Sequence, residues 1–502
     1  MRALTRFFNE KIVFHCCNLK DLSLELLLEE PLCVDVVLHP LLKSLEITQE
    51  NLTSVLDAAH NIPNVSYLSL CADTKRQSHP ESQLLQYMAT LTHLTALKLS
   101  CRVSDQLLAV LGLSCHSLKI LDAEADFKTS ITDRGLSFLA ACPRLASVIL
   151  NDEGTEFNAD TRYQSLTGPG VAHLIMSCPH LTLLTVDPHI LKEAILFLHS
   201  INYANKTFPL KYLHLRYTNN VFLNMASEMF PGLTNMRLEE PVNNVCESLV
   251  RFKKLENLNI GWYSRITEYS EQLQCSFERL TTLTLRNPMI HGFFDFEFLR
   301  NLGNWCVNLE TFTVAIYTDS LQAQSSTFTA NQRLHPRETF FPKLRSLMFE
   351  GDISIKMIET FLMAVKTLEK LSIYVHGFNF SSGMMDQLLL NLVKNGNLDN
   401  LEFLQCYHWE MSLETLLYLI DQSSLRTIWG LNLLDMTEES KETIKSHIRK
   451  NNLNISLCDG LAPDPTFGLQ FLDKKLGRQI DRLHEHAHQL EMENILVELS
   501  LL

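Results

Sequence analysis

Several features that would point to a membrane, secreted or nucleic-acid-binding protein are missing from this sequence. No run approaches 18 uncharged apolar residues, so no membrane-spanning helix is expected. Arg2, Arg6, Glu10 and Lys11 interrupt the apolar N-terminal residues, unlike the continuous apolar stretch of a secretory signal. Lys and Arg total 43 against 57 Asp and Glu, and a net charge of −14 repels phosphate backbones. We therefore expect neither a membrane nor a nucleic acid as partner.

The cysteines lack the arrangement that metal or redox chemistry needs. The chain has 13 of them, an odd number, and no two form a CxxC pair. In a reducing compartment, cysteines of this kind are small buried apolar residues. The sequence therefore predicts a cytoplasmic or nuclear protein. We expect it to bind no metal and no cofactor, and we expect none of the cysteines to be catalytic.

What the sequence has in abundance is an internal repeat. Its template is an apolar residue, two variable residues, a second apolar residue, one variable residue and a third apolar residue, as in NLKDLSL with Leu19, Leu22 and Leu24. The spacing averages about 27 residues, inside the roughly 20–29 residues of a leucine-rich repeat. The units begin at residues 19, 42, 65, 94, 118, 145, 181, 210, 233, 255, 280, 309, 344, 368, 398 and 425.

The segments between these units have the pattern of helices. QLLAVLGLSC, GLSFLAACPRL and GVAHLIMSCPHL place apolar residues at three- and four-residue spacing, and Thr132 and Thr167 supply helix starts. Another apolar residue, often Cys or Phe, usually stands three positions before the first leucine of a unit. We predict an α/β leucine-rich-repeat solenoid of about sixteen repeats over 1–456, with parallel strands on the concave face and helices outside.

The segments SITDRGLSFLAACPRLASVIL and SLTGPGVAHLIMSCPHLTLLTV resemble the cysteine-containing repeats of F-box/leucine-rich-repeat proteins. The repeat resemblance covers nearly all of residues 15–430. It implies a solenoid that recognises a substrate and an N-terminal helical box that docks onto a ubiquitin-ligase core. The box pattern, an L-P-x-E-like start and a V-C-x-x-W-like end, is not found here. Either the start is truncated or the ligase function does not carry over.

The variable positions between the strand leucines are expected on the concave face, mostly as solvated polar surface. No Ser/His/Asp or Cys/His set is expected to come together among them. They are Tyr212, His214, Arg216, Asn235, Arg237, Glu239, Asn257, Asn259, Thr282, Thr284, Arg286, Thr311, Thr313, Lys370, Ser372 and Tyr374.

Aromatic residues in loops of the C-terminal half suggest where a protein partner binds. Three loops, 71–83, 151–165 and 316–340, are long, and insertions in repeat proteins often map to the binding face. The shorter loops GWYSR, YVHGFNFSSG and QCYHWEM carry aromatic and Arg side chains, the usual anchors of protein interfaces. The partner-binding residues that we predict are Trp262, Tyr263, Arg265, Tyr374, Phe378, Tyr407 and Trp409.

The C-terminal segment contains an H-E-x-x-H motif at His484, Glu485 and His488, a spacing that can bind zinc on a helix. A Pro- and Gly-containing linker, 457–466, separates the repeats from residues 467–502. Leu476, Ile480, Leu483, Ala487 and Leu490 then form an apolar seam, which predicts an amphipathic helix that caps the solenoid or dimerises. A zinc hydrolase needs a third ligand and a catalytic domain, so this reading is a remote alternative.

The combined sequence pattern predicts a non-enzymatic protein-recognition scaffold. Its protein partner is expected on the concave face and on the loops of the C-terminal half. A substrate receptor of a ubiquitin ligase is the more specific hypothesis, and a generic adaptor or inhibitor-type leucine-rich-repeat protein is the alternative.

Overall fold

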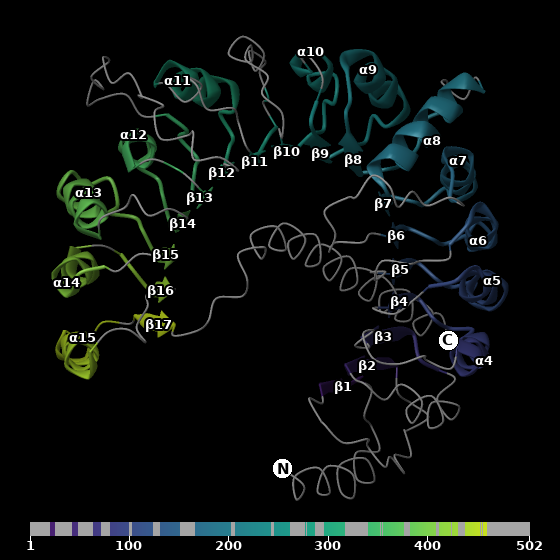
Figure 1. Ribbon diagram of the computed structural model, residues 1–502, viewed down its shortest axis with the longest axis horizontal. Coiled ribbons are helices and arrows are strands. Elements are labelled where there is room, and N and C mark those ends of the chain that lie inside the picture. The colour runs from purple at the N-terminus through teal and green to yellow at the C-terminus, as the bar shows by residue number, and fades with distance from the viewer. Residues whose placement is uncertain are drawn as a thin grey trace, which may run out of the picture. The chain divides into compact units, whose positions relative to one another are not determined.

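The computed structural model divides the chain into two units, Met1–Leu309 and Glu310–Leu502, which we call unit 1 and unit 2. Both are built from parallel strands joined by helices (Figure 1). The structure describes residues 21–25, 43–48, 64–71, 81–99, 103–123, 131–150, 166–201, 206–241, 245–261, 277, 279–286, 296–316, 340–351, 353, 355–375, 382–407, 411–422, 424–429, 437–451, 453 and 455–458.

Unit 1 contains eleven of the described strands, each pairing in parallel with the next from β1 to β7 and from β8 to β11. Leucines at alternate positions point into the core, as in β8, where Leu213 and Leu215 are fully buried. The strands are β1 (Asp21–Glu25), β2 (Ser44–Thr48), β3 (Tyr67–Cys71), β4 (Ala96–Leu99), β5 (Ile120–Ala123), β6 (Ser147–Ile149), β7 (Leu183–Thr185), β8 (Tyr212–Arg216), β9 (Asn235–Glu239), β10 (Asn257–Gly261) and β11 (Thr282–Arg286).

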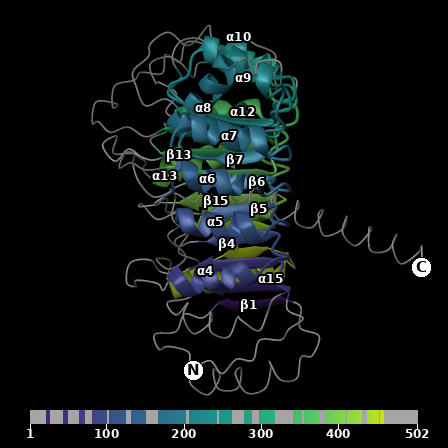
Figure 2. The same ribbon diagram turned by 90° about the vertical axis from the view of Figure 1, so that its right-hand side faces the viewer.

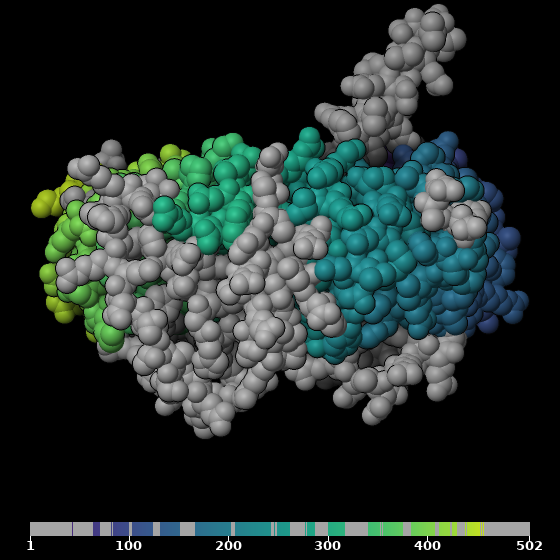
Figure 3. Space-filling view, turned by 90° about the horizontal axis from the view of Figure 1, so that it is seen from above, coloured from purple at the N-terminus to yellow at the C-terminus, as the bar shows by residue number. Residues whose placement is uncertain are grey.

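The helices of unit 1 follow the strands and stack on one another on the side away from the concave face. Figure 2 shows α4, α5, α6 and α7 in successive layers, and Figure 3 shows the described part of unit 1 from above, in blue and teal. Thr132 and Thr167 cap α6 and α7 through their side-chain oxygens, as the sequence predicts. The helices are α4 (Glu81–Thr90), α5 (Asp105–Ser114), α6 (Asp133–Leu139), α7 (Gly168–Ser177), α8 (Pro188–Ser200), α9 (Asn220–Met229), α10 (Cys246–Leu249) and α11 (Phe296–Trp305).

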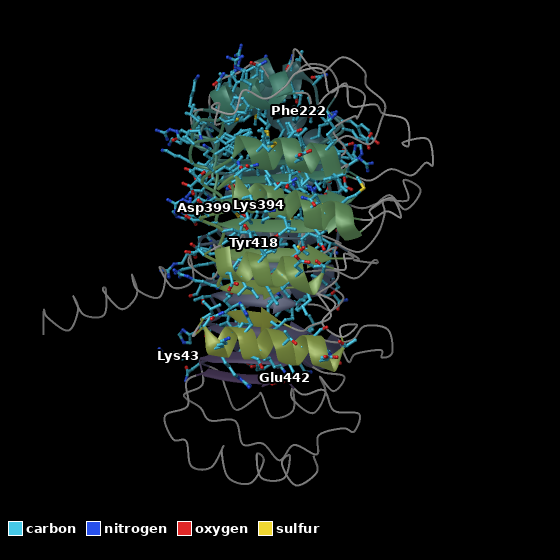
Figure 4. All side chains as sticks on the ribbon, turned by 90° about the vertical axis from the view of Figure 1, so that its left-hand side faces the viewer. Lys43, Phe222, Lys394, Asp399, Tyr418 and Glu442 are labelled. Carbon is cyan, nitrogen blue, oxygen red and sulfur yellow. The ribbon has the colours of Figure 1, made fainter. Side chains whose placement is uncertain are left out.

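Unit 2 repeats the same plan, with each strand from β12 to β17 parallel to the next. Figure 4 shows Lys394 on α13 and Tyr418 on α14, one helix above the other. The elements are β12 (Thr311–Ile316), β13 (Ser346–Gly351), α12 (Ile355–Ala364), β14 (Lys370–Val375), α13 (Ser382–Lys394), β15 (Phe403–Tyr407), α14 (Leu413–Gln422), β16 (Thr427–Trp429), α15 (Glu438–Lys450) and β17 (Ser456–Cys458).

The residue three positions before the first leucine of a unit packs inside the repeat, and we call its place the closing position. Cys115, Cys142 and Cys178 occupy this position in three consecutive repeats and are fully buried as free thiols. Phe230 and Phe341 fill it in later repeats. The prediction that these cysteines are packing residues is therefore confirmed for the ones that the structure describes.

One predicted repeat is in the wrong register. The sequence template starts that unit at Leu398, but β15 pairs Leu404 with Leu371 of β14, which makes Leu401 the first leucine. Leu398 instead occupies the closing position, where its carbonyl accepts a hydrogen bond from the Leu401 N–H. The error arose because Leu398, Leu401 and Phe403 match the apolar template by themselves. Two overlapping frames fit this unit, and only strand pairing distinguishes them.

The last described strand, β17, ends at Cys458, two residues beyond the expected end of the repeats at 456. No helix in the described ranges is long and apolar enough to cross a membrane. The predicted tail helix over 467–502, with its histidine motif, lies outside the described residues, as do most of the three long loops.

Candidate recognition surface

The parallel register of β8 to β11 aligns the side chains of the concave face in three rows. His214 pairs with Arg237, Arg237 with Asn259, and Asn259 with Thr284 in the middle row. The first row contains Tyr212, Asn235, Asn257 and Thr282, and the third contains Arg216, Glu239, Gly261 and Arg286. The predicted concave residues of these four strands are therefore confirmed as neighbours on one face.

The asparagines of the first row hold each other in place. The Asn257 side-chain amide donates to the Asn235 side-chain oxygen at 2.6 Å, and the Asn235 amide donates to the Thr234 hydroxyl at 2.8 Å. The first bond joins one repeat to the next along the row, and the second stays within one repeat. They fix the orientation of two amides that can each still donate and accept further hydrogen bonds.

A buried group of charged side chains lies beside this row, centred on Glu239. Glu239 Oε1 lies 2.8 Å from a guanidinium nitrogen of Arg237 and 3.2 Å from His214 Nε2. His214, Glu239 and Arg286 are 7%, 8% and 7% exposed. Gly261 separates Glu239 from Arg286 in the register and contributes no side chain between them.

Burial and pairing move the pKa values of this group in definite directions. Burial alone would raise the pKa of Glu239, but the contacts with His214 and Arg237 outweigh it and lower the pKa to about 2. Burial lowers the pKa of His214, against the opposing effect of Glu239. At neutral pH the carboxylate is therefore charged and the imidazole is neutral.

This chemistry fits recognition better than catalysis. A histidine beside a carboxylate can serve as an oriented base, but this carboxylate also binds Arg237, and the imidazole is almost closed to solvent. In the described part of the chain, no three His, Cys, Asp or Glu side chains form a group that could hold a metal ion. The arrangement presents fixed donors and acceptors on a rigid sheet.

The expectation that the concave side chains are solvated is wrong for several of them. His214, Glu239, Thr282, Thr284, Arg286 and Ser372 are all buried. Adjacent strands lie about 4.8 Å apart, so long side chains on neighbouring strands contact and shield each other. The sequence pattern places a side chain on this face, but it carries no information on how far the neighbouring side chains cover it.

Unit 2 has its own concave face, where Ser372 of β14 donates to Gln405 of β15 at 3.2 Å. The predicted binding residues Tyr374 and Tyr407 are register partners on these two strands. Tyr374 is half-buried. Of the other predicted residues, Trp262, Tyr263, Arg265, Phe378 and Trp409 all lie outside the described residues.

A polar groove of about 350 Å³ runs along the edge of unit 2 where the chain enters the strands. Arg345 lies 3.6 Å from Glu369 on this edge, and Arg426 lies 3.4 Å from Glu402. Both pairs are well exposed, so each contributes little to stability. The lining residues are Glu310, Pro342, Lys343, Arg345, Thr367, Glu369, Asn400, Glu402 and Ser424.

Sequence reasoning missed two residues that follow strands of unit 1. Tyr217 and Glu240 have φ values of 50° and 48°, in the left-handed region that residues other than glycine rarely adopt. The only sequence signal is that polar residues follow the apolar strand at both places. That pattern marks a strand end but does not reveal the backbone conformation.

No protein-family model matches the chain. Among solved structures, it is similar to a leucine-rich-repeat protein of Leptospira interrogans, with 14% identity over 89% of this chain and 97% of that chain and a TM-score of 0.31. It is also similar to a chain of the TLR13–ssRNA13 complex, with 16% identity, 78% and 63% coverage and a TM-score of 0.37.

A third similar structure is a chain of the Toll–Spatzle complex from Drosophila, with 13% identity, 78% and 43% coverage and a TM-score of 0.28. Identities and TM-scores this low carry no argument about function. The chain is a leucine-rich-repeat solenoid on the evidence of its own strand register and buried repeat positions.

Proposed function

We propose that this protein is a non-enzymatic protein-recognition scaffold that binds its partner on the concave face of its repeats. The observation that carries the proposal is the row formed by Tyr212, Asn235, Asn257 and Thr282, in which side-chain amides are held across strands. Groups that are already ordered lose little conformational entropy on binding, which favours affinity and specificity.

The chemistry of the face supports a protein partner rather than a nucleic acid. Its amides and hydroxyls suit the backbone and polar side chains of a protein, and the chain carries a net charge of −14. Arg237 and Arg216 are already paired with Glu239 and Glu240, at 2.8 and 3.0 Å. A phosphate backbone would have to compete with these carboxylates.

The test is affinity purification with quantitative mass spectrometry, comparing the wild-type chain with Asn257→Asp. This substitution keeps the side-chain volume but removes the amide donor that reaches Asn235. Leu113→Gln is the matched control, because Leu113 is 68% exposed on α5. We expect a partner that is retained by the control and lost with Asn257→Asp. An unchanged set of partners in both variants would contradict the proposal.

A more specific form of the proposal is a substrate receptor of a ubiquitin ligase. The buried Cys115, Cys142 and Cys178 at the closing positions support it through the resemblance of these repeats to those of F-box proteins. The discriminating observation is an in-frame F-box upstream of Met1, with co-purification of the ligase core. If both are negative, the generic adaptor or inhibitor role remains. Buried free thiols are compatible with the cytoplasmic or nuclear location that we propose.

The zinc-hydrolase alternative rests on the sequence motif of His484, Glu485 and His488 alone, because these residues lie outside the part of the chain that the structure describes. We expect His484→Ala with His488→Ala to leave partner binding unchanged and to abolish no hydrolysis. Leu483→Asp with Leu490→Asp should instead promote aggregation or dissociation, because it breaks the apolar seam of the proposed tail helix. A zinc-dependent cleavage that requires the histidines and is lost with chelators would overturn the scaffold proposal.

A further inference from the structure

The two left-handed residues of unit 1 occupy equivalent positions at the ends of neighbouring strands. Tyr217 follows β8 directly, and its N–H donates to the Glu239 carbonyl at 2.9 Å. Glu240 follows β9 directly, and its N–H donates to the Gly261 carbonyl at 2.7 Å. Such a conformation is strained for a residue with a side chain, and strain of this kind tends to occur at functional positions.

The Tyr217 side chain is held by three contacts. The Arg216 guanidinium carbon lies 4.9 Å from the centre of the ring, and the His189 ring lies 5.6 Å from it. The Tyr217 hydroxyl lies 3.3 Å from Glu240 Oε1, which also accepts a hydrogen bond from Arg216 at 3.0 Å. The ring is therefore fixed in one orientation before any partner arrives.

Despite these contacts, the ring remains accessible. Tyr217 is 39% exposed, and Val221, four residues further on at the start of α9, is 69% exposed. Phe222, the next residue, is buried on α9 (Figure 4). A fixed, partly exposed tyrosine four residues before an exposed aliphatic side chain has the character of an interface anchor, because it offers apolar area at low entropic cost.

Of the charged side chains around Tyr217, Lys192 has no acidic partner among the described residues. Arg216 pairs with Glu240, and Asp187 accepts the backbone N–H groups of His189 and Ile190 at the start of α8. Lys192 Nζ donates to the Tyr217 carbonyl at 2.6 Å and lies 5.9 Å from the centre of the Phe222 ring. Within the described residues, Lys192 forms no ion pair, so its charge is available to a partner.

We propose that Tyr217, Val221 and Lys192 form a docking surface, the Tyr217 surface, for an extended protein segment that carries an acidic side chain next to an apolar one. The apolar side chain packs on Tyr217 and Val221, and the carboxylate pairs with Lys192. This surface is distinct from the asparagine row of the concave face. It therefore stands or falls independently of the concave-face proposal.

The experiment is selection of a random twelve-residue peptide library, displayed on phage, against the full chain. Selected peptides are then synthesised, and their binding is measured by fluorescence anisotropy. Asparagine adopts left-handed φ values more readily than tyrosine does, so Tyr217→Asn removes the ring without adding backbone strain. Lys192→Gln removes the charge and keeps most of the aliphatic side chain.

We expect selected peptides in which Asp or Glu adjoins Leu, Ile, Phe or Trp. Tyr217→Asn should weaken their binding at least tenfold, and Lys192→Gln should weaken it severalfold at low salt and less at high salt. Leu113→Gln and the concave variant Asn257→Asp should leave the binding unchanged. Peptides without acidic residues, or binding that survives both Tyr217→Asn and Lys192→Gln, would overturn the proposal. Thermal melting of each variant shows whether a loss reflects unfolding.

Discussion

Asp133, the first residue of α6, accepts two hydrogen bonds from Thr167, the residue that caps α7 in the next repeat. The Thr167 N–H donates at 2.8 Å and its hydroxyl at 2.6 Å, one to each carboxylate oxygen. Asp105 of α5 accepts the same pair of bonds from Thr132, also at 2.8 and 2.6 Å. The residue that starts one helix therefore positions the start of the next, which sets the spacing between stacked repeats.

Replacing Asp133 with Ala should lower the free energy of unfolding by about 1–3 kcal/mol, because both Thr167 donors lose a charged acceptor. Urea unfolding followed by circular dichroism measures the change. Arg134→Ala is the matched control, since this exposed side chain lies in the same first turn. The prediction is wrong if both variants lower the free energy of unfolding equally. It is also wrong if Thr167→Val lowers that free energy as much in the Asp133→Ala background as in the wild type.

The glycine three positions beyond each capping threonine is part of the same contact between repeats. A Cβ on Gly170 would lie 2.0 Å from Asp133 Oδ1, and one on Gly135 would lie 2.2 Å from Asp105 Oδ1. The sequence analysis identified the threonines as helix starts from local chemistry alone. The contact of each threonine with a carboxylate in the preceding repeat was not predicted, because the carboxylate lies about one repeat away in the sequence and no local sequence pattern indicates it.

The same limit explains which parts of the candidate site could be predicted. Side chains alternate between the two faces of a strand, and this alternation correctly predicted that His214, Arg237 and Glu239 lie on one face. Their burial and mutual pairing depend on the register between β8 and β9, which the alternation within a single strand does not contain. Tyr217 escaped prediction because its φ value is set by hydrogen bonding to the next repeat rather than by its own preference.

Replacing Gly351 with Ala should destabilise unit 2 by about 3 kcal/mol or more, because the substitution combines backbone strain with a steric clash. Gly351 has a φ value of 88°, and a Cβ there would lie 1.9 Å from the Ile316 carbonyl oxygen. Gly383→Ala, on α13, is the control, because a Cβ at Gly383 meets nothing within 4 Å. That substitution should be neutral or slightly stabilising. Similar thermal melting of the two variants would contradict the assignment.

The cysteines at the closing positions should be chemically inert in the folded protein. Burial raises the pKa of Cys115 to about 12, that of Cys142 to about 11 and that of Cys178 to about 12. Since the thiolate is the reactive form, iodoacetamide at pH 8 should leave all three unmodified in the native state and modify them in urea. Peptide mass spectrometry reads this out site by site. Rapid native modification of any of them would show that its repeat opens or that the thiol is accessible.

The pair His214 and Glu239 should make folding stability depend on pH in two ranges. The folded pKa of Glu239, about 2, lies below its ordinary value of 4.5. Its contribution is therefore present above pH 4.5 and is lost as the pH falls toward 2. The pKa of His214 is also lowered from its ordinary 6.5. Below pH 6.5 the unfolded chain binds a proton that the folded chain does not, so stability again falls as the pH falls.

Urea unfolding at pH 7, 5.5, 4 and 3 separates the two groups when variants are compared with the wild type. Glu239→Gln should lower stability at pH 7, on the order of 2 kcal/mol, and the difference from wild type should shrink below pH 4.5. The other carboxylates of the chain titrate in both proteins and cancel in this difference. His214→Gln should remove the part of the pH dependence that begins near 6.5. A constant difference between wild type and Glu239→Gln from pH 7 to 3 would show that the carboxylate is not held in its charged form by His214 and Arg237.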